Sequence, residues 1–179
     1  HGLVARYRGM KFATILTDLE RRLGAPPPEG FAARYRAHVT SLFETSLTAM
    51  PGARAMLEAL QHPRCVASSG PRAKIEQSLR VCGLAPFIGD RIFSAYEVGS
   101  WKPDPGLFLY AAHAMGCMPA DCIVVEDSEV GLAAAAAAGM RAIHYCPHGA
   151  SSEDGCVIRI DDHAQLGEAI RALASGRHR

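Results

Sequence analysis

Hydrophobic residues in the first fifty positions recur at helical spacing, about 3.6 residues per turn. A second helical pattern runs from 31 to 47, and three consecutive prolines at 26–28 predict a loop before it. Gly24 is placed to end the first helix. The pattern therefore predicts two helices and no strand in this region, the first helix carrying its apolar face on Ile15, Leu16, Leu19 and Leu23.

After Pro51 and Gly52 the pattern changes, because short β-prone runs begin to alternate with helical stretches. Strands that recur between helices favour a parallel sheet joined by right-handed crossovers. We therefore predict an α/β fold with a doubly wound, Rossmann-like parallel sheet. The expected strands are 64–67, 91–93, 122–125 and 141–145, and the expected helices are 53–60, 72–82, 105–115, 129–138 and 163–174.

The composition of the chain argues against two classes of binding partner, nucleic acids and membranes. Hydrophobic residues make up 49% of the 179 residues and the formal net charge is +1, which argues against a nucleic-acid partner. No apolar run approaches the roughly 20 residues that cross a bilayer, so no membrane partner is expected. The six cysteines include no C-x-x-C pair, which favours a reducing compartment and a cytoplasmic location.

Polar residues with related chemistry follow the predicted strands. In doubly wound sheets the ligand site lies beyond the carboxyl ends of the strands. Ser68, Ser69 and Gly70 follow one run, Lys102 lies in the loop after another, and the pair at 126–127, Glu126 and Asp127, follows a third. A hydroxyl, backbone amides, an ammonium group and two carboxylates predict a site for a phosphate group and a divalent cation.

The carboxylate pair has two interpretations. Adjacent side chains at a strand tip point opposite ways, so one carboxylate can bind a metal while the other supports it. Hard oxygen ligands favour Mg²⁺, which keeps several waters and shares substrate phosphate oxygens. Alternatively, Asp127 or Ser128 serves only as the N-cap of the helix expected at 129–138.

The other two motifs also have alternatives. Ser68, Ser69 and the first amides of the next helix can converge on an anion, although a serine N-cap followed by Pro71 at the first helical position explains the same residues. Lys102 lies on a loop stiffened by Trp101 and two prolines, where it can neutralise a phosphoryl group and a carboxylate. An ordinary turn lysine remains the alternative.

Together the motifs resemble a known family. Ser68 after a strand, Lys102 in WKPDPGLFLYAA and the pair in VVEDSEVGLAAAAAAGM resemble motifs two, three and four of the haloacid dehalogenase superfamily, and more narrowly the β-phosphoglucomutase and sugar-phosphate phosphatase subgroup. Residues 1–50 resemble most of the helical cap of this subgroup, with RGMKFATIL similar to the cap segment in which a glycine precedes a basic residue. Residues 51–179 resemble its α/β core.

The resemblance implies a role for each motif residue. Ser68 binds the transferring phosphoryl group, with Ser69 and Gly70 beside it, and Lys102 stabilises that group together with the nucleophile. Asp127 coordinates Mg²⁺, and Glu126 assists at the metal or just behind it. Lys11 of the cap holds the remote end of the substrate, unless it is a solvated lysine at the start of a helix.

One motif of the family is missing. Its first strand ends in D-x-D-G-[TV], where the first aspartate attacks phosphorus, and no such string occurs here. The nearest match, at 17–20, continues a helical pattern, so Asp18 is expected on the cap surface. We expect the natural product to extend before His1. Without that central strand, its neighbours should have unpaired backbone groups and an open slot between them.

The expected function is Mg²⁺-dependent hydrolysis of a small phosphorylated metabolite through an aspartyl-phosphate, with the 179 residues alone inactive. A phosphoglucomutase-like isomerase would use the same residues. A haloacid dehalogenase needs no metal, and the carboxylate pair argues against it. A non-catalytic binding protein is the alternative if the chain is naturally complete.

Overall fold

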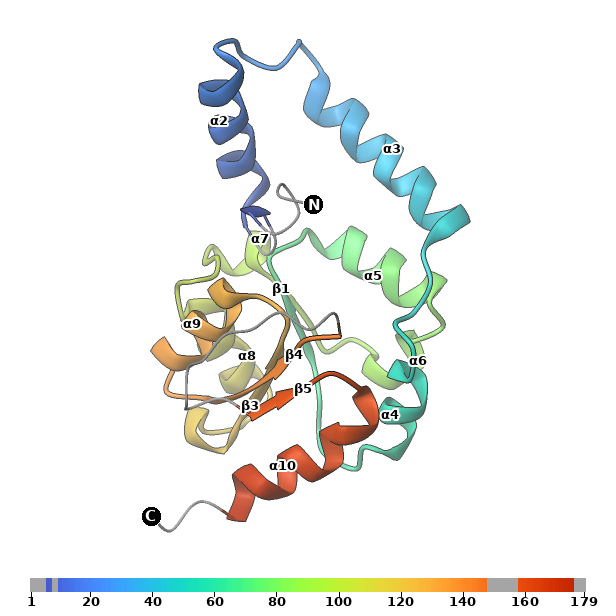
Figure 1. The fold of residues 1–179 in the computed structure, drawn as a ribbon, viewed down its shortest axis with the longest axis vertical. Coiled ribbons are helices and arrows are strands. Elements are labelled where there is room, and N and C mark those ends of the chain that lie inside the picture. The colour runs from blue at the N-terminus through green and yellow to red at the C-terminus, as the bar shows by residue number, and fades with distance from the viewer. Residues whose placement is uncertain (1–5, 8–9, 148–157, 176–179) are drawn as a thin grey trace.

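The computed structural model describes residues 6–7, 10–147 and 158–175 (Figure 1). Two helices, α2 and α3, stand above an α/β body that contains all the described strands (Figure 1). The helices are α2 (Phe12–Leu23), α3 (Phe31–Ser46), α4 (Ala53–Ala59), α5 (Arg72–Val81), α6 (Ala85–Ile88), α7 (Ala95–Val98), α8 (Gly106–Ala114), α9 (Glu129–Ala137) and α10 (Leu166–Ser175), with 3₁₀ turns at Pro119–Asp121 and His163–Gln165.

All described strand pairs are parallel. The strands are β1 (Val66–Ser68), β2 (Ile92–Ser94), β3 (Ile123–Glu126), β4 (Arg141–Tyr145) and β5 (Ile158–Ile160). β1 pairs with β2, and β4 lies between β3 and β5. The predicted α/β class and parallel pairing are confirmed. The sequence did not predict β5, α6 or α7, which have three or four residues each.

Helices cover both faces of the strands, as a doubly wound fold requires. On one face, α8 and α9 pack Phe108 and Ala134 against Val124 of β3 and Ala142 of β4. On the other face, α10 packs against β4 and β5, and α5 packs against β1 and β2. Buried apolar residues therefore support the strands whose carboxyl ends, at β1 and β3, carry the predicted site residues.

The strands form two sheets instead of one. Within the described residues no hydrogen bonds join β1 to β3, which belong to different sheets. A cavity of about 540 Å³ is lined by residues of both strands, among them Ala67 and Val124. This arrangement agrees with the expected slot between two unpaired neighbours.

The first two helices are held differently from the rest. Neither α2 nor α3 contains a buried residue. Contacts between α3 and α5 are largely polar: Glu44 pairs with Arg80, and Gln77 Nε2 donates to the Thr40 carbonyl at 2.9 Å. Gly24 ends α2 in the left-handed conformation at φ 73°, as predicted. None of the helices in the described segments is long and apolar enough to cross a membrane.

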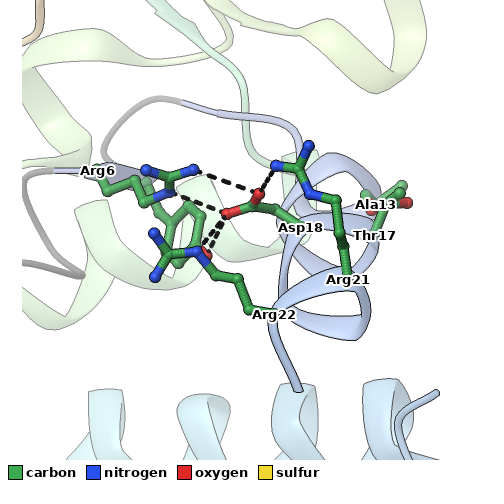
Figure 2. A network of polar contacts seen from close by, with 7 residues as sticks. Arg6, Ala13, Thr17, Asp18, Arg21 and Arg22 are labelled. Atoms are coloured by element: carbon green, nitrogen blue, oxygen red, sulfur yellow. Dashed lines mark hydrogen bonds and ion pairs between the residues drawn. The ribbon is translucent and has the colours of Figure 1, made fainter. Parts of the chain in front are cut away.

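Asp18 is the centre of a polar network on α2 (Figure 2). Its carboxylate pairs with Arg6, Arg21 and Arg22 and accepts a hydrogen bond from the Tyr7 hydroxyl at 2.7 Å. Asp18 lies on a helix, as predicted, but its side chain is only 11% exposed. Partners from residues 6–7 and from the next helical turn cover part of this carboxylate on the cap.

Candidate active site

Lys102 and Glu126 form a buried ion pair. The ammonium group of Lys102 contacts Glu126 Oε1, and the two side chains are only 7% and 9% exposed. Lys102 Nζ also lies 4.9 Å from the centroid of the Phe108 ring. Since a buried charge is costly without a partner, each member of the pair depends on the other.

The second carboxylate oxygen of Glu126 organises the turn between β3 and α9. It accepts hydrogen bonds from the Asp127 N–H at 3.0 Å, the Ser128 N–H at 3.1 Å and the Ser128 hydroxyl at 2.8 Å. Burial acts to raise the pKa of Glu126, but the charge of Lys102 and the hydrogen bonds from Lys102 and Ser128 outweigh it, so the pKa is lowered. Glu126 is therefore a carboxylate at neutral pH, with both oxygens engaged.

Gly131 makes room for this carboxylate. A Cβ atom built on Gly131 would lie 2.1 Å from Glu126 Cδ, a distance that no side chain can occupy. Sequence reasoning missed this residue. The available signal was a glycine in the first turns of an alanine-rich helix, where alanine would favour the helix by about 1 kcal/mol.

Asp127, the residue after Glu126, is exposed. It lines a pocket of about 420 Å³ together with Glu126, Tyr145 and His163. The N-cap of α9 is Ser128, whose hydroxyl accepts from the Gly131 N–H at 3.2 Å. Of the two capping residues considered from the sequence, Ser128 has that role and Asp127 does not.

The described residues do not form a ready-made metal cage. Within 6–7, 10–147 and 158–175, no group of three or more His, Cys, Asp or Glu side chains is arranged to hold a metal ion. Mg²⁺ needs no such cage, because it commonly uses one or two carboxylates and completes its shell with water and phosphate oxygens. The exposed carboxylate of Asp127 suits that kind of site.

The loop after β1 presents hydroxyl and backbone groups. Ser68 ends the strand, and its Oγ accepts from the Gly70 N–H at 3.1 Å. The fully buried Ser94 donates to the Gly70 carbonyl at 2.7 Å, a support that the sequence did not reveal. Ser69 Oγ is buried without a hydrogen-bond partner among the described residues. A serine N-cap was the wrong alternative, because Pro71 occupies the cap position of α5.

The predicted site residues are brought together to different degrees. Lys102 and Glu126 touch, and Asp127 is the next residue. In the described part of the chain no hydrogen bond joins Ser68 to Lys102, although Ala67 lines the same cavity as Lys102 and Glu126. Lys11 does not extend into open solvent: it is half-buried, with Nζ 3.7 Å from the centroid of the Trp101 ring.

Comparison with known proteins identifies the family of this chain. A family model for haloacid dehalogenase-like hydrolases matches residues 3–139. The 6-phosphogluconate phosphatase of Escherichia coli (strain K12) is 36% identical over 170 residues, covering 93% of this chain and 77% of that protein.

Two solved structures share the fold. A haloacid dehalogenase-like protein of unknown function from Agrobacterium tumefaciens has a TM-score of 0.81 at 28% identity, covering 97% of this chain and 82% of that chain. A hydrolase of the same superfamily from Deinococcus radiodurans, solved with phosphate and sodium, has a TM-score of 0.75 at 28% identity, covering 97% and 80%. The prediction is confirmed at the level of family and enzyme class, a phosphoric monoester hydrolase. The chain belongs to the haloacid dehalogenase-like hydrolases.

Proposed function

We propose that this protein is a Mg²⁺-dependent phosphatase acting on a small phosphorylated sugar or sugar acid. The observation that carries the proposal is the buried pair of Lys102 and Glu126, which sets a cation and the adjacent Asp127 at the tip of β3. The similarity to a 6-phosphogluconate phosphatase supports this substrate class. Five free cysteines in the described chain support a reducing, cytoplasmic setting.

The residues at the tip of β3 fit a magnesium site with one direct protein ligand and one supporting carboxylate. We assign Asp127 as the direct ligand, because its carboxylate is exposed in the pocket of about 420 Å³. Glu126 lies just behind it, with both oxygens held by Lys102 and the β3–α9 turn. When bound, Mg²⁺ would offset negative charge on the phosphoryl oxygens.

The remaining groups bind and polarise the phosphoryl group. Ser68 Oγ and the unpartnered Ser69 Oγ would donate to its oxygens, with the Gly70 backbone beside them. Lys102 would stabilise the charge that develops in the transition state, where catalysis of phosphoryl transfer mostly resides. Because Glu126 fixes the ammonium group in advance, little reorganisation accompanies the reaction.

The nucleophile is not among the 179 residues, since no D-x-D-G string occurs in them. We place it on a strand that fits the cavity between β1 and β3, with its carboxyl end beside Lys102. Its aspartate would attack phosphorus, the ester oxygen would leave with a proton, and water would then hydrolyse the aspartyl-phosphate. The 179 residues alone would bind the phosphate ester without turning it over.

We assign residues 1–50 as a cap over a core at 51–179. Lys11, at the start of α2, would hold the end of the substrate remote from the phosphoryl group. Its ammonium group lies on Trp101, the residue directly before Lys102, which links the cap to the loop of the site. Closure of such a cap on bound substrate would exclude water from the site.

The test is phosphate release by the full-length protein from 6-phosphogluconate and related sugar phosphates. We expect release that stops when EDTA removes the metal, returns with added Mg²⁺ and falls at least about a hundredfold in Asp127→Ala. Glu168→Ala, on α10, is the matched control. Undiminished Mg²⁺-dependent release by Asp127→Ala would contradict the assignment.

The reaction product distinguishes a phosphatase from a phosphoglucomutase-like isomerase. With β-glucose 1-phosphate as substrate, a phosphatase releases inorganic phosphate, whereas a mutase returns the phosphoryl group and yields glucose 6-phosphate. We expect phosphate. A full-length protein, verified by mass, that gives neither product here and releases no phosphate from 6-phosphogluconate or the related sugar phosphates with Mg²⁺ present would favour a non-catalytic binding protein.

A further inference from the structure

We propose that His163 is a positioning residue: it anchors the cap–core junction (residues 47–52) at Pro51 and thereby sets the cap relative to Asp127. The junction joins α3 to α4. This inference rests on the proposed phosphatase function, because it takes residues 1–50 as a cap, and it adds to that function a residue outside the motifs of the site.

The anchor is a hydrogen bond between two residues that are 112 positions apart in the chain. His163 Nδ1 lies 2.8 Å from the carbonyl oxygen of Pro51. Since a carbonyl oxygen can only accept, Nδ1 carries the proton in this contact. The imidazole therefore donates to the backbone of the junction.

The His163 ring is fixed by two neighbouring elements of the core. The residue before it, Asp162, caps the 3₁₀ turn by accepting from the Ala164 N–H at 2.8 Å. The Gln165 side chain accepts in return from the Asp162 N–H at 3.3 Å, which completes a capping box. The ring packs on Tyr145 at the end of β4, with centroids 4.2 Å apart and an interplanar angle of 32°. The donor is thus held in place before it reaches the junction.

Gly52 lets the junction lie close to this turn. Its φ of 76° is in the left-handed region, which favours glycine. A Cβ atom on Gly52 would lie 3.4 Å from His163 Cβ and 3.6 Å from a carboxylate oxygen of Asp162. The backbone of the junction therefore lies directly against the turn, and α4 begins at the next residue.

The anchor lies beside the proposed metal ligand. His163 and Tyr145 line the pocket of about 420 Å³ that also includes Asp127 and Met50, and Met50 directly precedes Pro51. His163 also lines the cavity of about 540 Å³ in which we place the strand of the nucleophile. A shift of the junction would therefore move the cap and the walls of the site together.

A second polar contact between cap and core is more exposed. Glu44 near the end of α3 pairs with Arg80 of α5, and their side chains are 44% and 62% exposed. Exposed ion pairs contribute little to stability, so this contact is able to open as a cap moves. Hinges are a few loop residues that absorb such a change. The bond from His163 puts the fixed end of this hinge at Pro51.

Two substitutions of His163 separate the hydrogen bond from the volume of the ring. In His163→Asn the amide nitrogen takes the position of Nδ1 and keeps a donor for Pro51, whereas His163→Leu fills the space without a donor. With 6-phosphogluconate and the full-length enzyme, we expect kcat/KM to fall about five- to tenfold in His163→Leu and less than about twofold in His163→Asn. The control is His113→Leu, at an exposed position on α8, which should leave kcat/KM unchanged.

A small substrate isolates the contribution of the cap. Acetyl phosphate has almost no remote end for a cap to enclose, so its hydrolysis gains little from the position of the cap. Its kcat/KM should change by less than about twofold in His163→Leu. Equal falls for acetyl phosphate and 6-phosphogluconate would mean that His163 only supports the core, and would overturn the inference. So would an equal loss in His163→Asn and His163→Leu.

Amide hydrogen exchange in the full-length protein tests the anchor without turnover. The Ala53 N–H donates to the Met50 carbonyl at 3.1 Å, and the Met56 N–H donates to the Gly52 carbonyl at 2.9 Å. These bonds join the junction to α4, so their amides report its opening. They should exchange about five- to tenfold faster in His163→Leu than in the wild type, while the amides of β4 keep their rates.

The exchange experiment also separates this inference from the phosphatase proposal. Unchanged exchange at the junction, or an equal acceleration in β4, would contradict the anchor. If the wild type released no phosphate from either substrate while the exchange difference was present, only the phosphatase proposal would be contradicted.

Discussion

Lys102 and Lys11 both lie over an aromatic ring, but their surroundings are different. Lys102 faces Phe108 on α8, a helix with four buried residues, and its charge is paired with Glu126. Lys11 faces Trp101 from α2, a helix with no buried residue. The first lysine is fixed by apolar packing and a buried partner, whereas the second is held by contacts near solvent.

This contrast assigns different tasks to the two regions. Interactions in a water-poor site are stronger and cost little reorganisation, which suits the stabilisation of a developing charge. Contacts at an exposed helix contribute less to stability, so they tolerate change. We therefore expect substitutions around Lys102 to lower stability and activity together, and substitutions around Lys11 to change mainly the choice of substrate.

The largest effect should come from Lys102→Met. It leaves the buried Glu126 without a partner, and breaking a buried ion pair in this way costs about 3–5 kcal/mol. Phosphate release should be lost as well. Urea unfolding and a phosphate assay measure the two effects, and Lys74→Met, which removes an exposed lysine over Phe43, is the control. Equal stability of the two variants would contradict the claim that the buried Lys102 contributes more to stability than a lysine near solvent.

A smaller but still clear loss of folding stability is expected for Gly131→Ala. The new methyl group would overlap Glu126, so the carboxylate or the helix must shift, at a cost of about 1–3 kcal/mol. In α10, Gly167→Ala meets only ordinary contacts and should stabilise its helix by up to about 1 kcal/mol. Thermal unfolding of both variants checks the signs. A stabilised Gly131→Ala would mean that Glu126 does not need this space.

The smallest effect on folding stability is expected from a substitution of Asp18. Hydrogen bonds from Arg6, Tyr7 and Arg21 hold the pKa of Asp18 far below its ordinary value of 3.8. The folded state therefore keeps this carboxylate ionised where the unfolded chain is protonated. The resulting stabilisation is complete above about pH 5 and is lost as the pH falls towards the lowered pKa.

Melting temperatures of the wild type and Asp18→Asn across a pH series measure this contribution. Their difference should be constant above about pH 5 and shrink in acid. Glu20→Gln, at an exposed position on the same helix, should show no such dependence. A difference that grows in acid would contradict the network.

The periodic elements were predictable from the sequence. Each expected strand and core helix has its counterpart within three residues, because alternation between β-prone and helical runs is a local property. Asp18 shows the limit of such reasoning. Its helix was predicted correctly, but the partners that cover its side chain include residues twelve and eleven positions away, which no local pattern specifies.

The candidate site was predictable in its residues but not in their arrangement. Glu126 and Asp127 were recognised as a carboxylate pair at the end of a strand, but the sequence did not show that Glu126 pairs with Lys102, which is 24 residues distant. Gly131 and Ser94 were missed for a related reason. Their roles depend on which atoms approach them in the folded chain, and a glycine or serine carries no other signal.

A crystal structure with Mn²⁺ in place of Mg²⁺ and with inorganic phosphate would locate the metal by its anomalous scattering. We expect one peak at the Asp127 carboxylate, phosphate oxygens near the hydroxyls of Ser68 and Ser69, and an intact contact between Lys102 and Glu126. A metal bound away from Asp127, or Glu126 detached from Lys102, would show that the strand tip does not work as described.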